Sequence, residues 1–238
     1  MVRHPIAVLF LAFALAVPAA AQQDRDEEWG ALRERMVQEQ VAARGVRDSA
    51  TLAAMRHVPR HEFVPAQVRR LAYEDSPLPI GRDQTISQPY IVALMTELVR
   101  PAKGDRVLEV GTGSGYQAAV FAAAGCRVWT IEIFETLANE ARERLRRLGY
   151  QDVTVRHGDG YAGWREEAPF DAIVVTAGAD AVPPALIEQL ARRGRLVMPV
   201  GDPYTDQRLV LLEKDTAGRV STRYLVPVRF VPLLRGVR

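Results

Sequence analysis

The chain has 238 residues, of which 48% are hydrophobic and 25% are charged. These proportions are ordinary for a globular protein, so they exclude a disordered tail, a collagen and a polytopic membrane protein. The 31 basic and 29 acidic side chains leave a formal net charge of +2, and this balance gives no reason to expect a nucleic-acid partner. A single cysteine excludes an internal disulfide, and with four histidines we expect no metal site.

The first 21 residues predict a secretory signal peptide. A short basic start precedes an apolar run at 6–17 that is too short to span a membrane as a helix, and small residues follow as far as Ala21. Cleavage after Ala21 would release a mature chain, 22–238, which we expect to be periplasmic or secreted and to have no stable membrane association. A wrongly assigned start codon and an uncleaved N-terminal anchor are the alternatives.

The next part of the chain, 31–100, is expected to be mainly helical. Apolar residues recur at helical spacing from Ala31 to Arg44, and Gly45 is placed to end this helix. Asp48 is placed to cap a second, short helix that reaches about His57. Prolines interrupt the segment 59–82, which we expect to be ordered but irregular.

After Pro101 the pattern changes to strands that alternate with helices. This alternation is typical of a parallel, doubly wound sheet. The last strands are joined by short turns such as Ala217-Gly218, which suggests an antiparallel edge. The expected strands are 107–110, 127–133, 153–156, 172–176, 196–200 and 209–213. One expected helix follows the first strand and ends at about Ala124, and two more span 135–148 and 185–192.

A glycine-rich loop joins the first of these strands to its helix. The sequence from Glu109 reads Glu-Val-Gly-Thr-Gly-Ser-Gly-Tyr, with glycines at Gly111, Gly113 and Gly115. Glycine allows a tight turn and lets a ligand approach the main chain. Glu132 ends the next strand, about twenty residues further on, where a carboxylate is expected to bind the two hydroxyl groups of a ribose.

The residue order in this loop distinguishes between kinds of ligand. A dinucleotide loop needs glycine at position 116, where this chain has Tyr116. A hydrolase nucleophile elbow around Ser114 needs glycine in place of Thr112. Glycines at alternate positions after an acid are similar to the S-adenosylmethionine loop of Rossmann-like methyltransferases, and a tight turn without a ligand is the remaining alternative.

A second glycine-containing turn follows the third strand, with the sequence His157-Gly158-Asp159-Gly160. Asp159 is a candidate acceptor for the amino group of an adenine, while Gly160 leaves room for the ring. A plain turn role for Asp159 is the alternative, and it is the commoner role of aspartate beside glycine.

The segment just before the first helix of the sheet is the most specific motif of the chain. It reads Gln84-Thr85-Ile86-Ser87-Gln88-Pro89-Tyr90. Together with 58–65, 77–81, the glycine loop, the 157–160 turn and the C-terminal Val-Arg-Phe-Val-Pro-Leu at 228–233, it resembles the protein-L-isoaspartate (D-aspartate) O-methyltransferase family. The resemblance covers the chain from Arg33 onward.

This resemblance implies a fold and an activity. The fold would be a Rossmann-like, doubly wound, mostly parallel sheet with an antiparallel edge, as in class I S-adenosylmethionine-dependent methyltransferases, preceded by a helical N-terminal extension. A single domain, 22–238, would bind substrate through 31–100 and cofactor through 101–238. The enzyme would transfer a methyl group from S-adenosylmethionine to the α-carboxylate of isoaspartyl residues, and the ester would collapse to a succinimide that reopens partly as normal aspartate. We expect a monomer that acts on isoaspartyl-containing proteins and peptides and needs no metal. The alternative to export is a cytoplasmic location, which is usual for the family.

The resemblance also assigns roles to individual residues. The active-site serine falls on Ser87, with Thr85 and Ile86 beside it in substrate binding. The substrate carboxylate has a pKa of about 4 in model peptides and is ionised at neutral pH, so its attack needs no strong base. A helix cap is a second, compatible role for Ser87, because Pro89 lies in the first turn of an apolar helix. The expected cofactor-binding residues are Glu109, Gly111, Gly113, Gly115, Glu132, Asp159 and Gly160.

One position departs from the family pattern. Asp83 stands where the family usually has glycine, just before the Gln84–Tyr90 motif. Its charge would either weaken the binding of a carboxylate substrate or point to solvent. S-adenosylmethionine is made in the cytoplasm, so an exported protein would be separated from its source. Together with the charge of Asp83, this leaves a non-catalytic, exported binding module as one alternative. A methyltransferase for another acceptor is the other, and the Ser87 motif argues against it.

Overall fold

The computed structural model describes residues 19–202 and 205–236, with side chains from Asp26 onward. Most of the predicted signal peptide, residues 1–18, lies outside the described residues. Among the described helices none is both long and apolar enough to cross a membrane.

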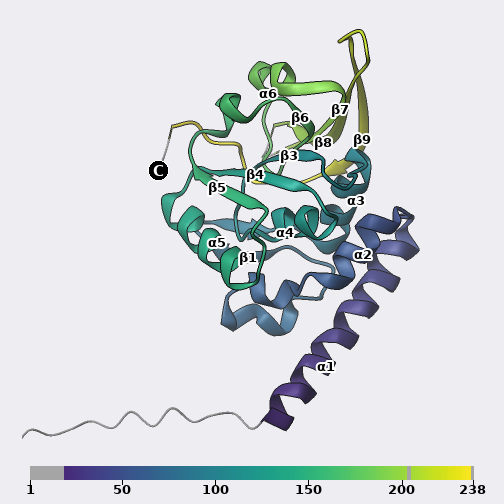
Figure 1. Ribbon diagram of the computed structural model, residues 1–238, viewed down its shortest axis with the longest axis vertical. Coiled ribbons are helices and arrows are strands. Elements are labelled where there is room, and N and C mark those ends of the chain that lie inside the picture. The colour runs from purple at the N-terminus through teal and green to yellow at the C-terminus, as the bar shows by residue number, and fades with distance from the viewer. Residues whose placement is uncertain (1–18, 203–204, 237–238) are drawn as a thin grey trace, which may run out of the picture.

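A seven-stranded sheet forms the centre of the molecule (Figure 1), with the strand order β5-β4-β3-β6-β7-β8-β9. The five strands from β5 to β7 pair in parallel, and β8 and β9 extend the sheet antiparallel. This is the doubly wound sheet with an antiparallel edge that the sequence predicts. The strands are β3 (Arg106–Val110), β4 (Arg127–Glu132), β5 (Val153–His157), β6 (Phe170–Val175), β7 (Leu190–Gly201), β8 (Gln207–Lys214) and β9 (Val220–Val228).

Both faces of the sheet are covered, which explains why its central strands are continuous apolar runs. On one face Val107 and Val174 pack with Met95 of α3 (Pro89–Val99) and Phe121 of α4 (Tyr116–Ala123). On the other face Leu108, Ile173 and Val175 pack with Leu186 of α6 (Pro184–Gln189). Alternate residues of each strand therefore belong to different clusters, as strand geometry requires. The helix α5 (Glu135–Arg147) joins α4 on the first face (Figure 1).

The N-terminal extension is helical, as predicted, although its first helix begins earlier and ends differently. The helix α1 spans Ala19–Arg35 and continues through a π-helical segment, Met36–Val41, and a short 3₁₀ turn. Gly45 ends it with a φ of 99°, a left-handed conformation that glycine adopts without steric cost. The next helix, α2 (Ser49–His57), begins where predicted, and the Asp48 side chain accepts a hydrogen bond from the Thr51 amide at 2.7 Å.

The prediction of an irregular segment at 59–82 is wrong in its last part. Two 3₁₀ turns are followed by the antiparallel hairpin of β1 (Leu78–Gly81) and β2 (Gln84–Ile86). The prolines of this segment indicated a chain without strands, but a two-stranded hairpin consists entirely of edge strands, where proline is tolerated. Arg82 and Asp83 form the turn with φ values of 55° and 56°, the left-handed conformations that a tight two-residue hairpin turn requires.

The boundary between α6 and β7 also differs from the prediction. The helix expected to reach residue 192 ends at Gln189, and β7 begins at Leu190. Leu190 pairs with Phe170 of β6, and the pairing is irregular before it resumes at Arg195. Arg193 there has a φ of 67°. Tertiary pairing with β6 therefore overrides a local sequence that has adequate helix propensity.

Candidate active site

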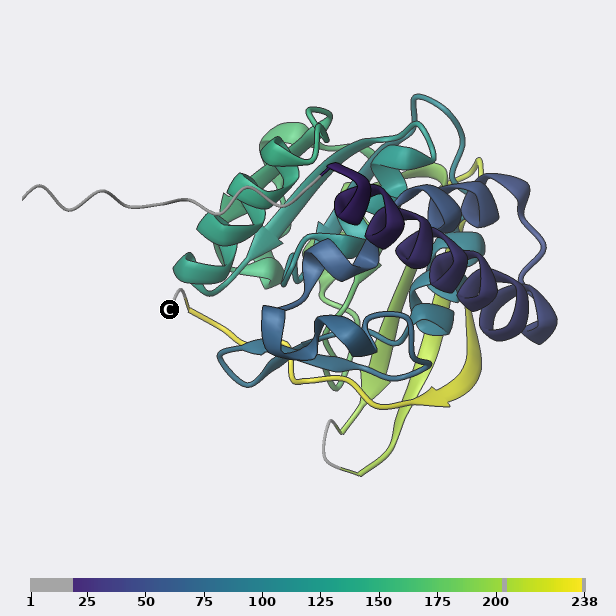
Figure 2. The ribbon, with the colours of Figure 1, turned by 90° about the horizontal axis from the view of Figure 1, so that it is seen from below.

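Two adjoining cavities open at the carboxyl ends of the parallel strands, where ligands bind in sheets of this kind. The inner cavity, about 60 Å³, lies over the glycine loop and the ends of β3 and β4. The outer cavity, about 630 Å³, lies between the start of α3 and the end of β9. Thr85, Thr176 and Val231 line both cavities, so the two spaces meet at these residues. The C-terminal segment after β9 passes beside the β1–β2 hairpin (Figure 2) and forms part of both walls.

Beside the inner cavity, glycine is needed for steric reasons at one point of the glycine loop and at one point of the 157–160 turn. Gly111 has a φ of 100°, and a Cβ added there would lie 2.4 Å from Thr176 Oγ1. That hydroxyl donates a hydrogen bond to the Gly111 carbonyl at 2.7 Å, which fixes the loop against the end of β6. A Cβ on Gly160 would lie 2.2 Å from Val110 Cγ1. Glycine at these two positions therefore lets the loop and the turn pack closely against the ends of β6 and β3 beside the inner cavity.

Glu132 presents its carboxylate to the inner cavity from the end of β4. The side chain is 5% exposed and accepts hydrogen bonds from the amides of Gly113, at 2.7 Å, and Phe134, at 3.1 Å. Burial raises the pKa of Glu132, and these backbone hydrogen bonds oppose the shift. The remaining lone pairs of a carboxylate held in this way suit a pair of ribose hydroxyl groups.

Glu109 occupies a different environment from Glu132, although the sequence suggested similar roles for both. It is fully buried beneath the glycine loop, accepts a hydrogen bond from the Thr130 hydroxyl, and leaves its Oε1 without a partner. Burial raises the pKa of Glu109 to about 8, so the group is mostly protonated at neutral pH. It borders a small void of about 30 Å³ that Ser87 also lines, and it does not line the inner cavity.

Asp159 is held by backbone groups rather than directed at the inner cavity. Its Oδ1 accepts a hydrogen bond from the Tyr161 amide at 2.9 Å, and its Oδ2 accepts one from the Gly236 amide at 3.1 Å. It thus caps a turn and fixes the C-terminal segment, which is the plain turn role that the sequence left open. The neighbouring Gly160 does line the cavity, and a contact between Asp159 and an adenine stays a prediction.

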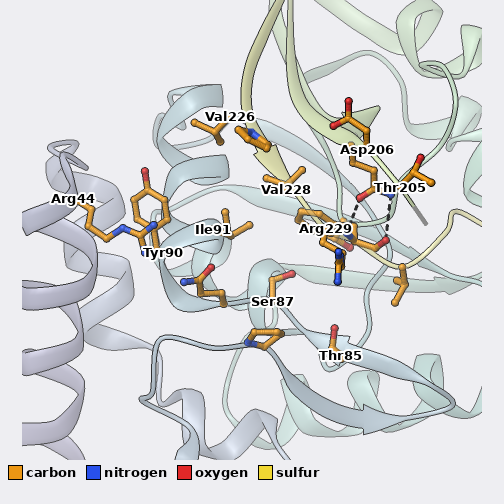
Figure 3. Close-up of a pocket in the computed structure, with 17 residues that line it drawn as sticks. Arg44, Thr85, Ser87, Tyr90, Ile91, Thr205, Asp206, Val226, Val228 and Arg229 are labelled. Atoms are coloured by element: carbon orange, nitrogen blue, oxygen red, sulfur yellow. Dashed lines mark hydrogen bonds between the residues drawn. The ribbon is translucent and has the colours of Figure 1, made fainter. Parts of the chain in front are cut away.

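Ser87 lies in the connection between β2 and α3 and lines the outer cavity. It is not the helix cap: Gln88 occupies that position, and no side chain caps the helix. Within the described part of the chain the Ser87 hydroxyl has no hydrogen-bond partner. Figure 3 shows the hydroxyl groups of Ser87 and Thr85 directed into the outer cavity. The pleat of β2 turns Ile86 the other way, into the core, where it is 4% exposed.

Several residues of the two cavities were missed by sequence reasoning. Thr176 follows β6 directly and lies at a carboxyl strand end, a position that could have been read from the predicted topology. The C-terminal segment carried no such signal and was noted only as a family motif. It is fixed by hydrogen bonds between the side chain of Gln207 and the backbone of Phe230, at 2.6 and 3.2 Å, and by the Gly178 amide, which donates to the Val231 carbonyl at 2.8 Å.

The sheet order, the antiparallel edge and the glycine loop at the end of β3 define a class I S-adenosylmethionine-dependent methyltransferase fold. The family model described as protein-L-isoaspartate(D-aspartate) O-methyltransferase matches residues 31–238. The chain therefore belongs to the protein-L-isoaspartate (D-aspartate) O-methyltransferase family.

Individual relatives agree with this assignment. The chain is 57% identical over 217 residues to a protein-L-isoaspartate O-methyltransferase of Opitutus terrae, covering 91% of each chain. It is 52% identical over 240 residues to protein-L-isoaspartate O-methyltransferase 2 of Syntrophobacter fumaroxidans, covering 97% of this chain and 95% of the relative. Among solved structures, a putative protein-L-isoaspartate O-methyltransferase from Plasmodium falciparum in complex with S-adenosyl-L-homocysteine is 27% identical, has a TM-score of 0.73, and is matched over 86% of this chain and 99% of that one.

Proposed function

We propose that this protein is a protein-L-isoaspartate O-methyltransferase, which transfers the methyl group of S-adenosylmethionine to the α-carboxyl group of L-isoaspartyl and D-aspartyl residues in damaged proteins and so initiates their repair. The observation that carries the proposal is the position of Ser87. Its unpaired hydroxyl faces a cavity large enough for a peptide segment, and Thr85 and Thr176 connect that cavity to the glycine loop.

The residues of the inner cavity suit the cofactor. Glu132 is placed to accept hydrogen bonds from ribose hydroxyl groups, and Gly111, Gly113 and Gly160 line the cavity with main chain that carries no side chain. When bound, S-adenosylmethionine supplies a methyl group on a positively charged sulfur. Gly115 has a structural role in the loop. It is the N-cap residue of α4 with a φ of 88°, and it faces Leu145 rather than the cavity.

The residues of the outer cavity suit an acceptor that is already ionised. The Ser87 hydroxyl would donate a hydrogen bond to one carboxylate oxygen and leave the other free to attack. A carbon–oxygen bond forms as the carbon–sulfur bond breaks, and the products are a neutral ester and a neutral thioether. No proton has to be removed from the acceptor, because the carboxylate is ionised at neutral pH. The site contributes mainly by alignment, which can lower a barrier by ~7–11 kcal/mol.

Transfer of a radiolabelled methyl group tests this function. The purified protein is incubated with tritium-labelled S-adenosylmethionine and either of two peptides that differ only in an isoaspartyl or an aspartyl linkage at one position. We expect base-labile label on the isoaspartyl peptide and none on the aspartyl control peptide. Binding of S-adenosylhomocysteine without any transfer to the isoaspartyl peptide would instead favour a non-catalytic binding module.

We further propose that the protein is exported and that it acts as a monomer. The support for export is the sequence of residues 1–21, whose predicted cleavage site after Ala21 lies in the first turn of α1. Among the residues whose side chains the structure describes, from Asp26 onward, the first buried one is Met36. The monomeric state is carried over from the family resemblance, and sedimentation tests it. N-terminal sequencing of the native protein should begin at Gln22, and a retained Met1 would contradict export. Sedimentation should give the mass of a single chain, and the mass of a dimer would contradict the monomer.

A further inference from the structure

Arg229 is a cation in the wall of the outer cavity that has no partner within the described part of the chain. It lies directly after β9 and lines the cavity together with Ser87 and Thr85. Figure 3 shows its side chain entering the space that the Ser87 and Thr85 hydroxyl groups face. Asp206 belongs to the same wall, but no ion pair joins it to Arg229.

Arg44, the other arginine of the described wall, is already engaged. Its guanidinium forms an ion pair with Asp75 at 2.9 Å and lies 3.5 Å from the centre of the Tyr90 ring. Both contacts hold Arg44 at the far side of the cavity. The two arginines thus differ: Arg44 is part of the wall, whereas Arg229 is free to bind a ligand.

The side chain of Arg229 is exposed, but the main chain beside it is fixed. Gln207, itself 3% exposed, accepts a hydrogen bond from the Phe230 amide at 2.6 Å and donates one to the Phe230 carbonyl at 3.2 Å. The next residue, Val231, is held through its carbonyl by the Gly178 amide. A rigid backbone that carries an uncommitted guanidinium into a cavity is the arrangement expected of a binding residue.

We propose that Arg229 binds the α-carboxylate of the isoaspartyl substrate together with Ser87, and that it thereby distinguishes the substrate from its methyl ester product. This inference rests on the proposed function. A planar guanidinium matches a carboxylate in shape and charge, and it binds more strongly to the anion than to a neutral group.

The loss of charge during the reaction determines how Arg229 should affect the kinetics. The carboxylate is fully charged in the bound substrate, partly charged in the transition state and neutral in the ester. An interaction with Arg229 is therefore strongest before the reaction and weakest after it. Such an interaction lowers KM without retaining the neutral product, and it does not raise kcat.

The test compares Arg229→Gln and Arg229→Lys with the wild-type protein. Two peptide ligands are used: an isoaspartyl peptide, and the same peptide with its α-carboxyl group replaced by a neutral amide, which cannot accept the methyl group and acts as a competitive inhibitor. We expect Arg229→Gln to raise KM for the isoaspartyl peptide by about 10- to 100-fold. We expect kcat, the inhibition constant of the amide peptide and the affinity for S-adenosylhomocysteine to stay within a few-fold of wild type, and Arg229→Lys to be intermediate.

Arg223→Gln provides a matched control, because it removes the same charge from β9, the strand that directly precedes Arg229. Arg223 lies on β9 outside the cavity wall and forms only a long ion pair, 3.6 Å, with Glu213. It should leave KM unchanged. An unaltered KM in Arg229→Gln, or an equal loss of affinity for the carboxylate and the amide peptides, would overturn the role of Arg229 while leaving the proposed function intact. Absence of methyl transfer by the wild-type protein would overturn the proposed function itself.

Discussion

Glu109 is the residue whose environment departs most from what its place in the sequence suggests. An acid directly before a glycine loop points to contact with the ligand, yet this one lies beneath the loop with Oε1 unpartnered. Sequence alone could not have separated it from Glu132, because both acids lie within one residue of the carboxyl end of an apolar strand. The difference arises from register: Glu109 pairs with Val174 and lies among buried strands on both sides, whereas Glu132 lies one step past the end of β3.

The raised pKa of Glu109 predicts a pH dependence of stability. An acid with a folded-state pKa of about 8 and an ordinary unfolded-state value stabilises the fold fully at low pH, and this contribution is lost as the pH rises towards 8. Across that window wild-type stability should fall, relative to Glu109→Gln, by at most about 1.4 kcal/mol per pH unit. Urea unfolding of both proteins at several pH values between 5 and 8.5 measures the difference. Parallel stability profiles would show that Glu109 is ionised in the folded protein.

Among the elements, the β1–β2 hairpin shows how a substitution can matter for the fold rather than for the site. Asp83 is exposed at the hairpin turn and lines neither cavity. Its charge therefore has no direct contact with a bound carboxylate. The sequence could show that glycine is usual at this position, but not why: the reason is the positive φ of the turn.

Asp83→Gly should therefore stabilise the protein without changing its catalysis. Glycine adopts a φ of 56° without steric cost, so we expect a gain of about 0.5–1 kcal/mol in the free energy of unfolding. Asp83→Asn, which removes the charge but retains a residue that tolerates this conformation, should change neither stability nor KM. A clear decrease in KM for an isoaspartyl peptide in both variants would mean that the Asp83 charge does act on the substrate.

The C-terminal segment 231–236 is the second element with a predicted behaviour. The inner cavity of about 60 Å³ is much smaller than the about 300–1,000 Å³ of ordinary ligand pockets. Pro232, Leu233 and Leu234 form one of its walls, and we expect this wall to move outward when a nucleotide enters. We expect backbone amides of this segment to exchange hydrogen faster than those of β8 in the free protein, and more slowly once S-adenosylhomocysteine is bound. Equal exchange with and without the ligand would contradict this.

At the scale of the whole molecule, the sequence locates the cofactor half of the site on the fold more readily than it shows how the substrate half is assembled. The glycine loop and Glu132 belong to consecutive strand ends, and the rule for parallel sheets brings them together without further information. The outer cavity joins segments that no local rule connects: the hairpin at Thr85, the start of α3 and the chain after β9. Arg229 lines the same cavity as Ser87 because the chain after β9, the last strand of the antiparallel edge, runs back past the ends of the parallel strands.

The most direct test of this account is the effect of Ser87→Ala on methyl transfer and on cofactor binding in the same preparation. The account predicts a fall of roughly a hundredfold in kcat/KM for an isoaspartyl peptide, since one misaligned contact can cost that much, with S-adenosylhomocysteine affinity and melting temperature unchanged. Ser221→Ala, on the exposed strand β9, serves as the control and should retain full activity. Full transfer by Ser87→Ala would contradict the assignment of Ser87 as the residue that holds the substrate carboxylate.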